Sequence, residues 1–133
     1  MTEPPGAPTI LIADEDVGFL WWLGDLFHEL GYRSLPALSC SEALALVRTS
    51  GRQVDLLLIN PGLKGAARLI QTLERVRPLK VVFIRGPEEA YLFPGVQPLA
   101  TIERPAGWMP VMRQEWRLKL QRLLIQVGIR AAS

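Results

Sequence analysis

The sequence is poor in the residues from which covalent and metal-based frameworks are built. It holds one cysteine, Cys40, so no disulfide can form within the chain. The only histidine is His28, and two such residues are too few for a Cys/His zinc site. No apolar run approaches the ~18 residues of a membrane-spanning helix, so we expect no membrane association. These absences predict a protein of a reducing, cytoplasmic compartment.

Blocks of like charge and catalytic motifs are missing as well. The net charge is only +2, and the arginines are spread along the chain without a basic tail, which argues against nucleic-acid binding. There is no Gly-rich phosphate loop, and His28 stands in no Ser/His/Asp pattern, so we do not expect an enzyme. Residues 1–8 lack the basic and apolar regions of a signal peptide, and we expect them to be a flexible segment.

What the chain does contain is a series of apolar strands, each followed by polar residues. Hydrophobic residues make up 49% of the 133 residues, which is enough for one domain with a core. The alternation of strands and helices predicts an α/β fold with a doubly wound, five-stranded parallel sheet. The carboxyl ends of such strands form the edge where open α/β sheets bind ligands. The strands at 9–13, 54–59, 80–84 and 99–103 deliver Asp14-Glu15-Asp16, Asn60, Arg85 and Arg104 to this edge.

Caps and chain breakers set the expected boundaries. We expect a weak second strand at 32–35 that ends near Pro36, and main helices that end near residues 30, 49, 76 and 127. Asp14 or Asp16 is expected to cap the first helix, and Ser39 or Ser41 the second. Three prolines between the fourth and fifth strands leave room for only a short or irregular helix, at 88–93. The expected domain spans residues 9–127, and residues 128–133 form a tail.

This arrangement resembles the receiver domain of bacterial two-component response regulators, over roughly residues 8–127. The resemblance implies the strand order 2-1-3-4-5 and a phosphorylation site at the carboxyl edge of the sheet. Four of the active positions are changed while the pattern of the scaffold is kept, so the resemblance implies a pseudo-receiver. It assigns the Mg²⁺-binding acidic pair to Asp14 and Glu15 (with Asp16 beside them), the phospho-acceptor position to Asn60, the Thr/Ser position to Arg85, the Lys position to Arg104 and the aromatic switch position to Thr101.

The chemistry of Asn60 supports this interpretation. Acyl-phosphate formation needs an ionised carboxylate as nucleophile, which an amide does not provide. Asn60 also removes one negative charge from a Mg²⁺ site, so we expect no cofactor, with Mg²⁺ at Asp14 and Glu15 left open. We hypothesise that Arg85 or Arg104 takes the metal's electrostatic place by pairing with these carboxylates. The alternative is that both arginines are solvated at the surface.

Two apolar surfaces are candidates for a protein contact. On the last helix, Val111, Leu118 and Ile125 repeat at seven-residue spacing opposite the side expected to be buried, and Ile129 is expected to extend the row. On the first helix, Trp21 and Trp22 lie ~100° apart, so they cannot both be buried. The alternatives are scattered exposed aliphatic residues in the first case and tryptophans at the edge of the core in the second.

These observations lead to one interpretation and two alternatives. The interpretation is a phosphorylation-independent interaction module of bacterial signalling, which acts through protein partners or a homodimer formed by the last helix. It would act alone or as part of a longer regulator. The first alternative is an anion or small-molecule sensor that grips its ligand with Arg85 and Arg104. The second is a residual phospho-receiver with an altered site.

Overall fold

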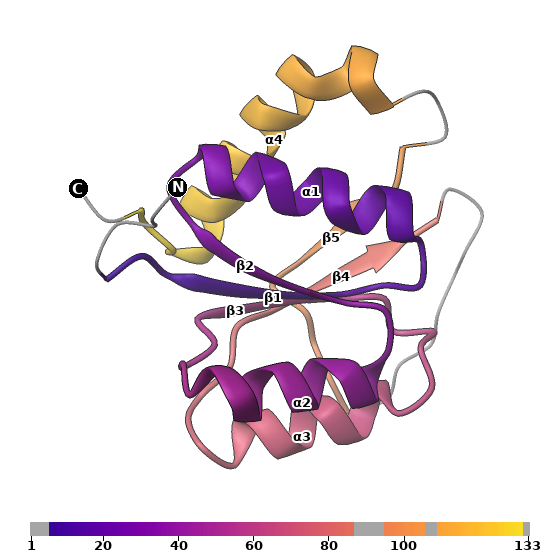
Figure 1. Ribbon diagram of the computed structural model, residues 1–133, viewed down its shortest axis with the longest axis vertical. Coiled ribbons are helices and arrows are strands. Elements are labelled where there is room, and N and C mark those ends of the chain that lie inside the picture. Colours follow the sequence, from indigo (N-terminus) through magenta and orange to yellow (C-terminus); the bar gives the residue numbers. More distant parts are fainter. Residues whose placement is uncertain (1–5, 87–94, 106–108, 132–133) are drawn as a thin grey trace.

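A five-stranded parallel sheet runs through the middle of the molecule, between two layers of helices (Figure 1). The computed structural model describes residues 6–86, 95–105 and 109–131. The observed sheet confirms the predicted fold class and strand order, because the order is β2-β1-β3-β4-β5 and every pairing is parallel. The strands are β1 (Thr9–Ala13), β2 (Arg33–Ala37), β3 (Leu56–Ile59), β4 (Val81–Arg85) and β5 (Ala100–Glu103).

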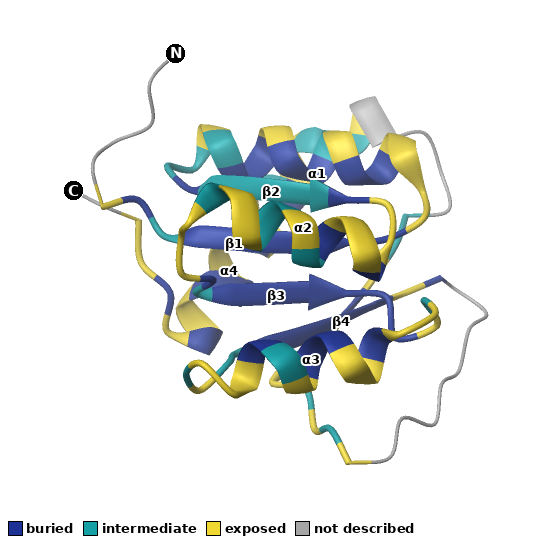
Figure 2. Ribbon diagram, turned by 60° about the horizontal axis from the view of Figure 1, so that its bottom comes forward, coloured by how far each residue is buried: buried dark blue, intermediate teal, exposed yellow. Residues whose placement is uncertain are grey.

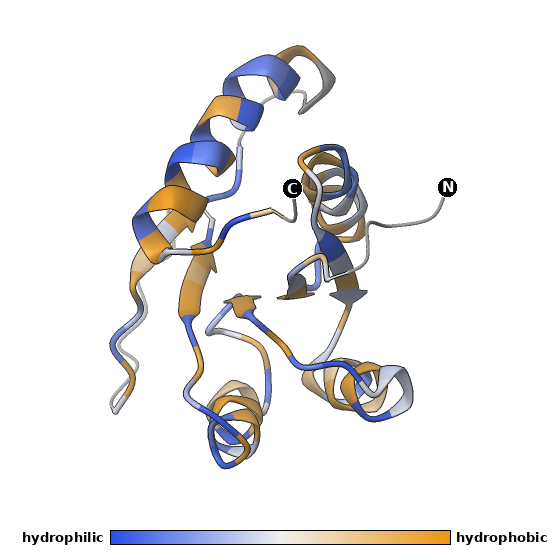
Figure 3. Ribbon diagram, turned by 90° about the vertical axis from the view of Figure 1, so that its left-hand side faces the viewer, coloured by the Kyte–Doolittle hydropathy of each residue, from blue (hydrophilic) through white to orange (hydrophobic). Residues whose placement is uncertain are grey.

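The helices divide between the two faces of the sheet, as the view along the sheet shows (Figure 3). Helices α1 (Val17–Glu29) and α4 (Arg113–Val127) pack on one face, and a short 3₁₀ turn, η1 (Met109–Met112), leads into α4. Helices α2 (Cys40–Ser50) and α3 (Ala66–Glu74) pack on the other face. Among the described helices, none is long and apolar enough to cross a membrane. The predicted short helix at 88–93 lies outside the described residues.

Two separate hydrophobic clusters follow from the alternation of side chains along the central strands. Successive residues of a strand point to opposite faces, and both faces are covered here. In β1, Ile10 and Ile12 therefore join the cluster under α1 and α4, whereas Leu11 and Ala13 join the cluster under α2 and α3. This explains why β1 and β3 are continuous apolar runs, and Figure 2 shows both strands as buried.

The helix caps match two of the expected residues. The Asp16 carboxylate accepts a hydrogen bond from the Phe19 backbone N–H at 3.1 Å and caps α1. The Ser39 hydroxyl accepts one from the Glu42 N–H at 3.1 Å and caps α2. Each bond satisfies a backbone donor that a helix start leaves without a partner. Asp16 thus has a structural role beside the predicted acidic pocket.

The second strand continues through Pro36, where the sequence indicated its end. Pro36 pairs in register with Ile12, and the strand runs on to Ala37. Proline has no backbone N–H to donate, so it is tolerated in a strand mainly at the edge of a sheet. Because β2 is an edge strand, the missing donor breaks no ladder, and the predicted boundary was wrong for this reason.

The chain after the last helix also departs from expectation. Gly128 adopts the left-handed conformation with φ 77°, which ends α4 and turns the chain back toward the sheet. The Ile129 N–H then donates to the Leu124 carbonyl at 2.9 Å, and the Ile129 side chain is only 8% exposed. Ile129 therefore belongs to the core and does not extend the exposed row of α4. Together with buried Ala7, it carries the packed core slightly beyond residues 9–127.

Candidate functional site

A buried carboxylate, Asp14, lies at the carboxyl edge of the sheet. It follows β1 directly, and its backbone N–H donates to the Ala37 carbonyl of β2 at 3.1 Å, which holds it in the sheet. The residue is 0% exposed. Its Oδ1 accepts a hydrogen bond from the Asp16 N–H at 3.2 Å. A carboxylate removed from water needs an opposite charge as well, because an isolated buried charge is very costly.

Arg104, which follows the edge strand β5, supplies that charge. Its Nη1 lies 3.0 Å from both Oδ1 and Oδ2 of Asp14. Because β3 and β4 lie between β1 and β5, the side chain reaches across the ends of both strands. It is 15% exposed, so the pair is largely removed from water. Of the two arginines that the sequence offered, Arg104 is the one that pairs with the predicted acidic pocket.

Arg85 has a different partner. It lies opposite Glu103 in the β4–β5 register, and its Nη2 is 3.7 Å from the Glu103 carboxylate. Both side chains are nearly half exposed, which limits the strength of the pair. Glu15, which the sequence grouped with Asp14, is exposed. The structure thus brings Asp14 and Arg104 together and leaves Arg85 and Glu15 at the surface.

Asn60 lies directly beside Asp14, because its N–H donates to the carbonyl of Ala13 at 2.9 Å. It is 2% exposed, and its side-chain Oδ1 accepts the Gly62 N–H at 2.8 Å. This bond closes a side-chain turn of the kind that Asn forms with the residue two positions ahead. The role of Gly62 was not anticipated, although the Asn-Pro-Gly sequence carries the signature of such a turn. The amide oxygen of Asn60 is therefore already satisfied within its own loop.

Solved structures with the same arrangement of strands and helices identify the fold. A response regulator receiver domain from Methanospirillum hungatei JF-1 matches with a TM-score of 0.65 at 20% identity, over 92% of this chain and 98% of that one. The receiver domain of an HD domain-containing protein from Pseudomonas fluorescens Pf-5 gives 0.67 at 22%, with the same coverage. A receiver protein from Burkholderia phymatum gives 0.66 at 16%, over 95% and 99%. This chain has the receiver fold.

The sequence comparisons add no family to this structural likeness. No protein-family model matches the chain, and no curated protein matches it in sequence. At identities of 16–22%, the solved structures speak for the architecture alone. The chemistry of this receiver-fold site must therefore be judged from its own residues.

The receiver fold implies Mg²⁺ beside the first strand, but the donors at this edge do not suit it. Both oxygens of Asp14 face the Arg104 guanidinium, so a divalent cation at the same oxygens would be repelled by a permanent positive charge. The Asn60 oxygen is neutral and engaged by Gly62. Across the described ranges, no three His, Cys, Asp or Glu side chains gather as metal ligands.

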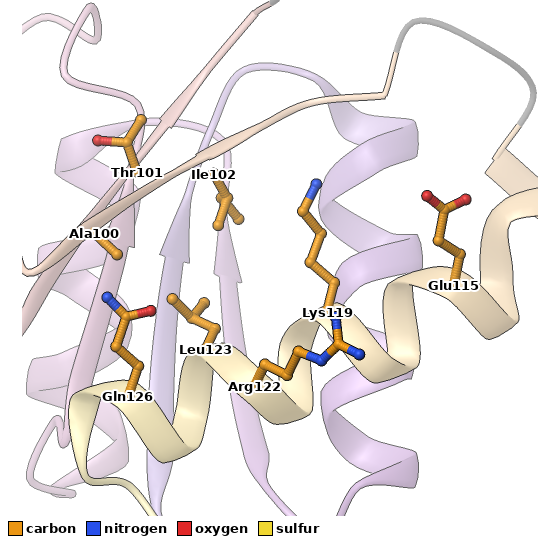
Figure 4. Close-up of a pocket in the computed structure, with 8 residues that line it drawn as sticks. All are labelled: Ala100, Thr101, Ile102, Glu115, Lys119, Arg122, Leu123 and Gln126. Atoms are coloured by element: carbon orange, nitrogen blue, oxygen red, sulfur yellow. The ribbon is translucent and has the colours of Figure 1, made fainter.

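Thr101, which the sequence resemblance assigned to the switch position, lies on β5 three residues before Arg104. Figure 4 shows Ala100 and Ile102 turned toward α4 and Thr101 turned away from it, as the alternation along a strand requires. Thr101 is exposed, and it lies at the rim of a pocket of about 370 Å³ between β5 and α4. The α4 side of this pocket carries Glu115, Lys119 and Arg122, which is a mixed set of charges.

The two tryptophans of α1 have different surroundings. Trp21 is 61% exposed. Trp22 is half-buried and meets Trp116 of α4 edge to face, with ring centroids 5.5 Å apart. Its Nε1 is buried and has no hydrogen-bond partner among the described residues. Trp22 therefore packs at the edge of the core, and Trp21 is the tryptophan that offers a surface for contact.

The predicted apolar row has the expected exposure, although Val111 lies in η1 and only Leu118 and Ile125 lie on α4. Val111, Leu118 and Ile125 are 72%, 48% and 78% exposed, whereas Trp116, Leu120 and Leu123 of α4 are buried. The row therefore lies on the outer surface of the molecule, and its residues belong to neither of the two core clusters. It remains a candidate contact surface.

Proposed function

We propose that this receiver-fold domain is a signalling module that works through protein contacts and without phosphorylation of its own site. The observation that carries the proposal is the pair between Arg104 and the buried Asp14. A guanidinium stays charged at any pH a cell reaches, so its attraction to these oxygens does not depend on pH within that range. Beside the pair, Asn60 offers an amide where phosphorylation needs an anionic nucleophile.

The pair also bears on how such a domain behaves. A switch needs two states whose balance a ligand or a modification can shift. Here the charge that would accompany metal binding is built into the chain as Arg104, and the Asn60 side chain is fixed by its own turn. We therefore expect this edge to keep one conformation, with regulation coming from the proteins that bind the domain. Protein partners in a two-component type of pathway fit this role.

The anion-sensor alternative has less support from the contacts. Arg104 is engaged by Asp14, and Arg85 lies near Glu103, so an incoming anion would compete with carboxylates at both positions. The residual phospho-receiver would require Asn60 to be replaced in function by another nucleophile. An interaction module requires neither the displacement of these carboxylates by an anion nor a nucleophile in place of Asn60.

Amide NMR spectra with and without Mg²⁺ and beryllofluoride, an acyl-phosphate mimic, test the proposal. We expect no change around residues 13–16 and 59–62. The spectrum of Asn60→Asp alone should also stay unchanged on addition of Mg²⁺ and beryllofluoride, because Arg104 still pairs with Asp14. Adding Arg104→Lys to that variant should restore a response, since lysine leaves one Asp14 oxygen accessible. Specific shifts in the unmodified domain would contradict the proposal, and a strong response of Asn60→Asp alone would favour the residual phospho-receiver.

The homodimer through α4 is tested separately. Light scattering at rising protein concentration should show self-association that Ile125→Glu abolishes. Val76→Glu is the matched control, because Val76 and Ile125 are both 78% exposed and Val76 lies just after α3. A monomer at all concentrations, or the same effect of both substitutions, would remove the dimer and leave a contact with another protein.

A further inference from the structure

A groove of about 650 Å³ runs between α2 and α3, on the face of the sheet opposite α1 and α4. Figure 2 shows this side of the molecule, with exposed residues along both helices. Among the described residues that line the groove, four carry cationic side chains and none is acidic, although the whole chain has a net charge of only +2. The four are Arg48 of α2, Lys64 before α3, Arg68 of α3 and Arg75 at its end.

These four side chains form a cluster of positive charge in which no member has a described carboxylate partner. All four are exposed, and within the described ranges none of them forms an ion pair. By contrast, Arg77, Arg85 and Arg113 each lie near a carboxylate. The acidic residues of α2 and α3, Glu42 and Glu74, lie outside the lining, and Glu42 accepts a hydrogen bond from the Leu38 N–H. No carboxylate of the described residues therefore neutralises the positive charge of the groove.

The spacing of the charges indicates the shape of the ligand. Arg68 and Arg75 are seven residues apart on one face of α3, which places them about 10 Å apart along the helix axis. Lys64 precedes the helix, and Arg48 borders the groove from α2. Charges distributed along two helices in this way suit an extended ligand with several negative groups better than a single phosphate.

The apolar residues of the groove indicate which class of extended, acidic ligand it would bind. Leu44 is half-buried and Leu69 is 3% exposed, so aliphatic side chains form the floor between the basic rims. No aromatic side chain is among the described residues that line it, whereas proteins that bind single-stranded nucleic acid stack bases on aromatic rings. An aliphatic floor instead accommodates apolar side chains of a peptide, in the manner of helix-in-groove recognition.

We propose that the groove between α2 and α3 docks an acidic, amphipathic segment of a partner protein. The proposal rests on the proposed function in one respect, namely that the domain acts through protein contacts. Basic rims steer an acidic segment toward the groove, and apolar contacts on the floor hold it there. The surface is independent of α1 and α4, which lie on the other face of the sheet. The sequence did not reveal it because its charges come from two helices and a loop.

Fluorescence anisotropy with a labelled 14-residue peptide tests the proposal, with leucines at helical spacing and glutamates at the other positions. We expect Arg68→Glu combined with Arg75→Glu to weaken binding at least ~tenfold at physiological ionic strength. The matched control is Arg122→Glu combined with Arg130→Glu, two exposed arginines outside the groove with the same change in net charge. The control should weaken binding less than ~twofold. Equal losses in both variants would overturn the proposal.

Three further probes separate the possible ligands. A peptide with serine in place of leucine should bind at least ~tenfold more weakly, because the aliphatic floor would lose its contacts. The other two probes are a dT14 oligonucleotide and phosphatidylcholine vesicles that contain phosphatidylserine. The proposal would be overturned if either of these bound the domain more tightly than the peptide does and if Arg68→Glu combined with Arg75→Glu abolished that binding. If Arg68→Glu combined with Arg75→Glu unfolds at a lower temperature than the unmodified domain, the binding test uses Arg68→Gln combined with Arg75→Gln instead.

NMR titration keeps the two proposals distinguishable. The peptide should shift the amide signals of residues 40–48 and 64–75, and beryllofluoride should shift none. If the peptide leaves these signals unchanged while beryllofluoride is also silent, the groove proposal fails and the phosphorylation-independent module stands. If beryllofluoride shifts the Asp14 edge while the peptide binds the groove, the proposed function fails and the docking surface stands.

Discussion

Replacing Arg104 with methionine should lower the free energy of unfolding by about 3 kcal/mol at neutral pH. Methionine retains much of the apolar stem of the side chain, so the change removes chiefly the charge and its hydrogen bonds. The Asp14 carboxylate, which is 0% exposed in the native domain, would then keep the Asp16 N–H at 3.2 Å as its described donor. The expected loss lies at the lower end of the range for broken buried pairs, because Arg104 is itself 15% exposed and water can reach the vacated position.

A double-mutant cycle separates the pair from its surroundings. Asp14→Asn keeps an acceptor for the Asp16 N–H and leaves Arg104 able to turn toward water, so we expect a loss of about 1 kcal/mol. The double variant should be about as stable as Asp14→Asn alone, because the uncompensated buried charge is gone. The cycle would then give a coupling energy of about 3 kcal/mol, which is at the upper end of the range for contacting residues.

Urea unfolding followed by far-UV circular dichroism and tryptophan fluorescence measures these changes, since Trp22 and Trp116 lie in or beside the core. Arg85→Met is the matched control. Its partner Glu103 is 3.7 Å away and both side chains are nearly half exposed, so the loss should stay within about 0.5 kcal/mol. A loss of less than about 0.5 kcal/mol for Arg104→Met, or strictly additive losses in the cycle, would refute the reasoning.

Three further predictions concern single residues. Asp16→Ala should cost about 1 kcal/mol by removing the cap of α1, whereas Asp16→Asn should not, and equal urea midpoints for the two would contradict the capping role. Burial raises the pKa of the Tyr32 phenol. The contribution of this neutral phenol to the free energy of unfolding is therefore complete below the usual pKa of about 10, and it is lost as the pH rises above that value. Wild type should therefore lose more stability than Tyr32→Phe between pH 9 and about 11, and parallel curves would count against this. Burial also raises the pKa of the Cys40 thiol, so a disulfide reagent should modify it at least ~tenfold more slowly in the native state than in urea at pH 8. Equal rates would mean that the thiol is accessible.

The local patterns of the sequence were sufficient for the framework of this domain. The apolar runs at β1 and β3 predicted buried parallel strands, because a strand covered on both faces needs no polar alternation. Asp16 and Ser39 marked helix starts, since a short polar side chain beside an apolar helical pattern satisfies free N–H groups. The exposure of Leu118 and Ile125 followed from helical periodicity alone. Each of these features depends on residues within a few positions of one another.

Only the tertiary structure decided which charges meet. Asp14 and Arg104 are 90 residues apart, and the sequence left Arg85 and Arg104 as equal candidates for the pairing. The choice depends on the strand order and on the reach of one side chain across two strand ends, which no local pattern encodes. The same holds for Ile129, which a left-handed glycine returns to the core, and for Pro36, which an edge position tolerates. The basic groove likewise exists only because the fold places α2 beside α3. Periodicity and capping act over a turn or two of chain, whereas a site is assembled by contacts between distant segments.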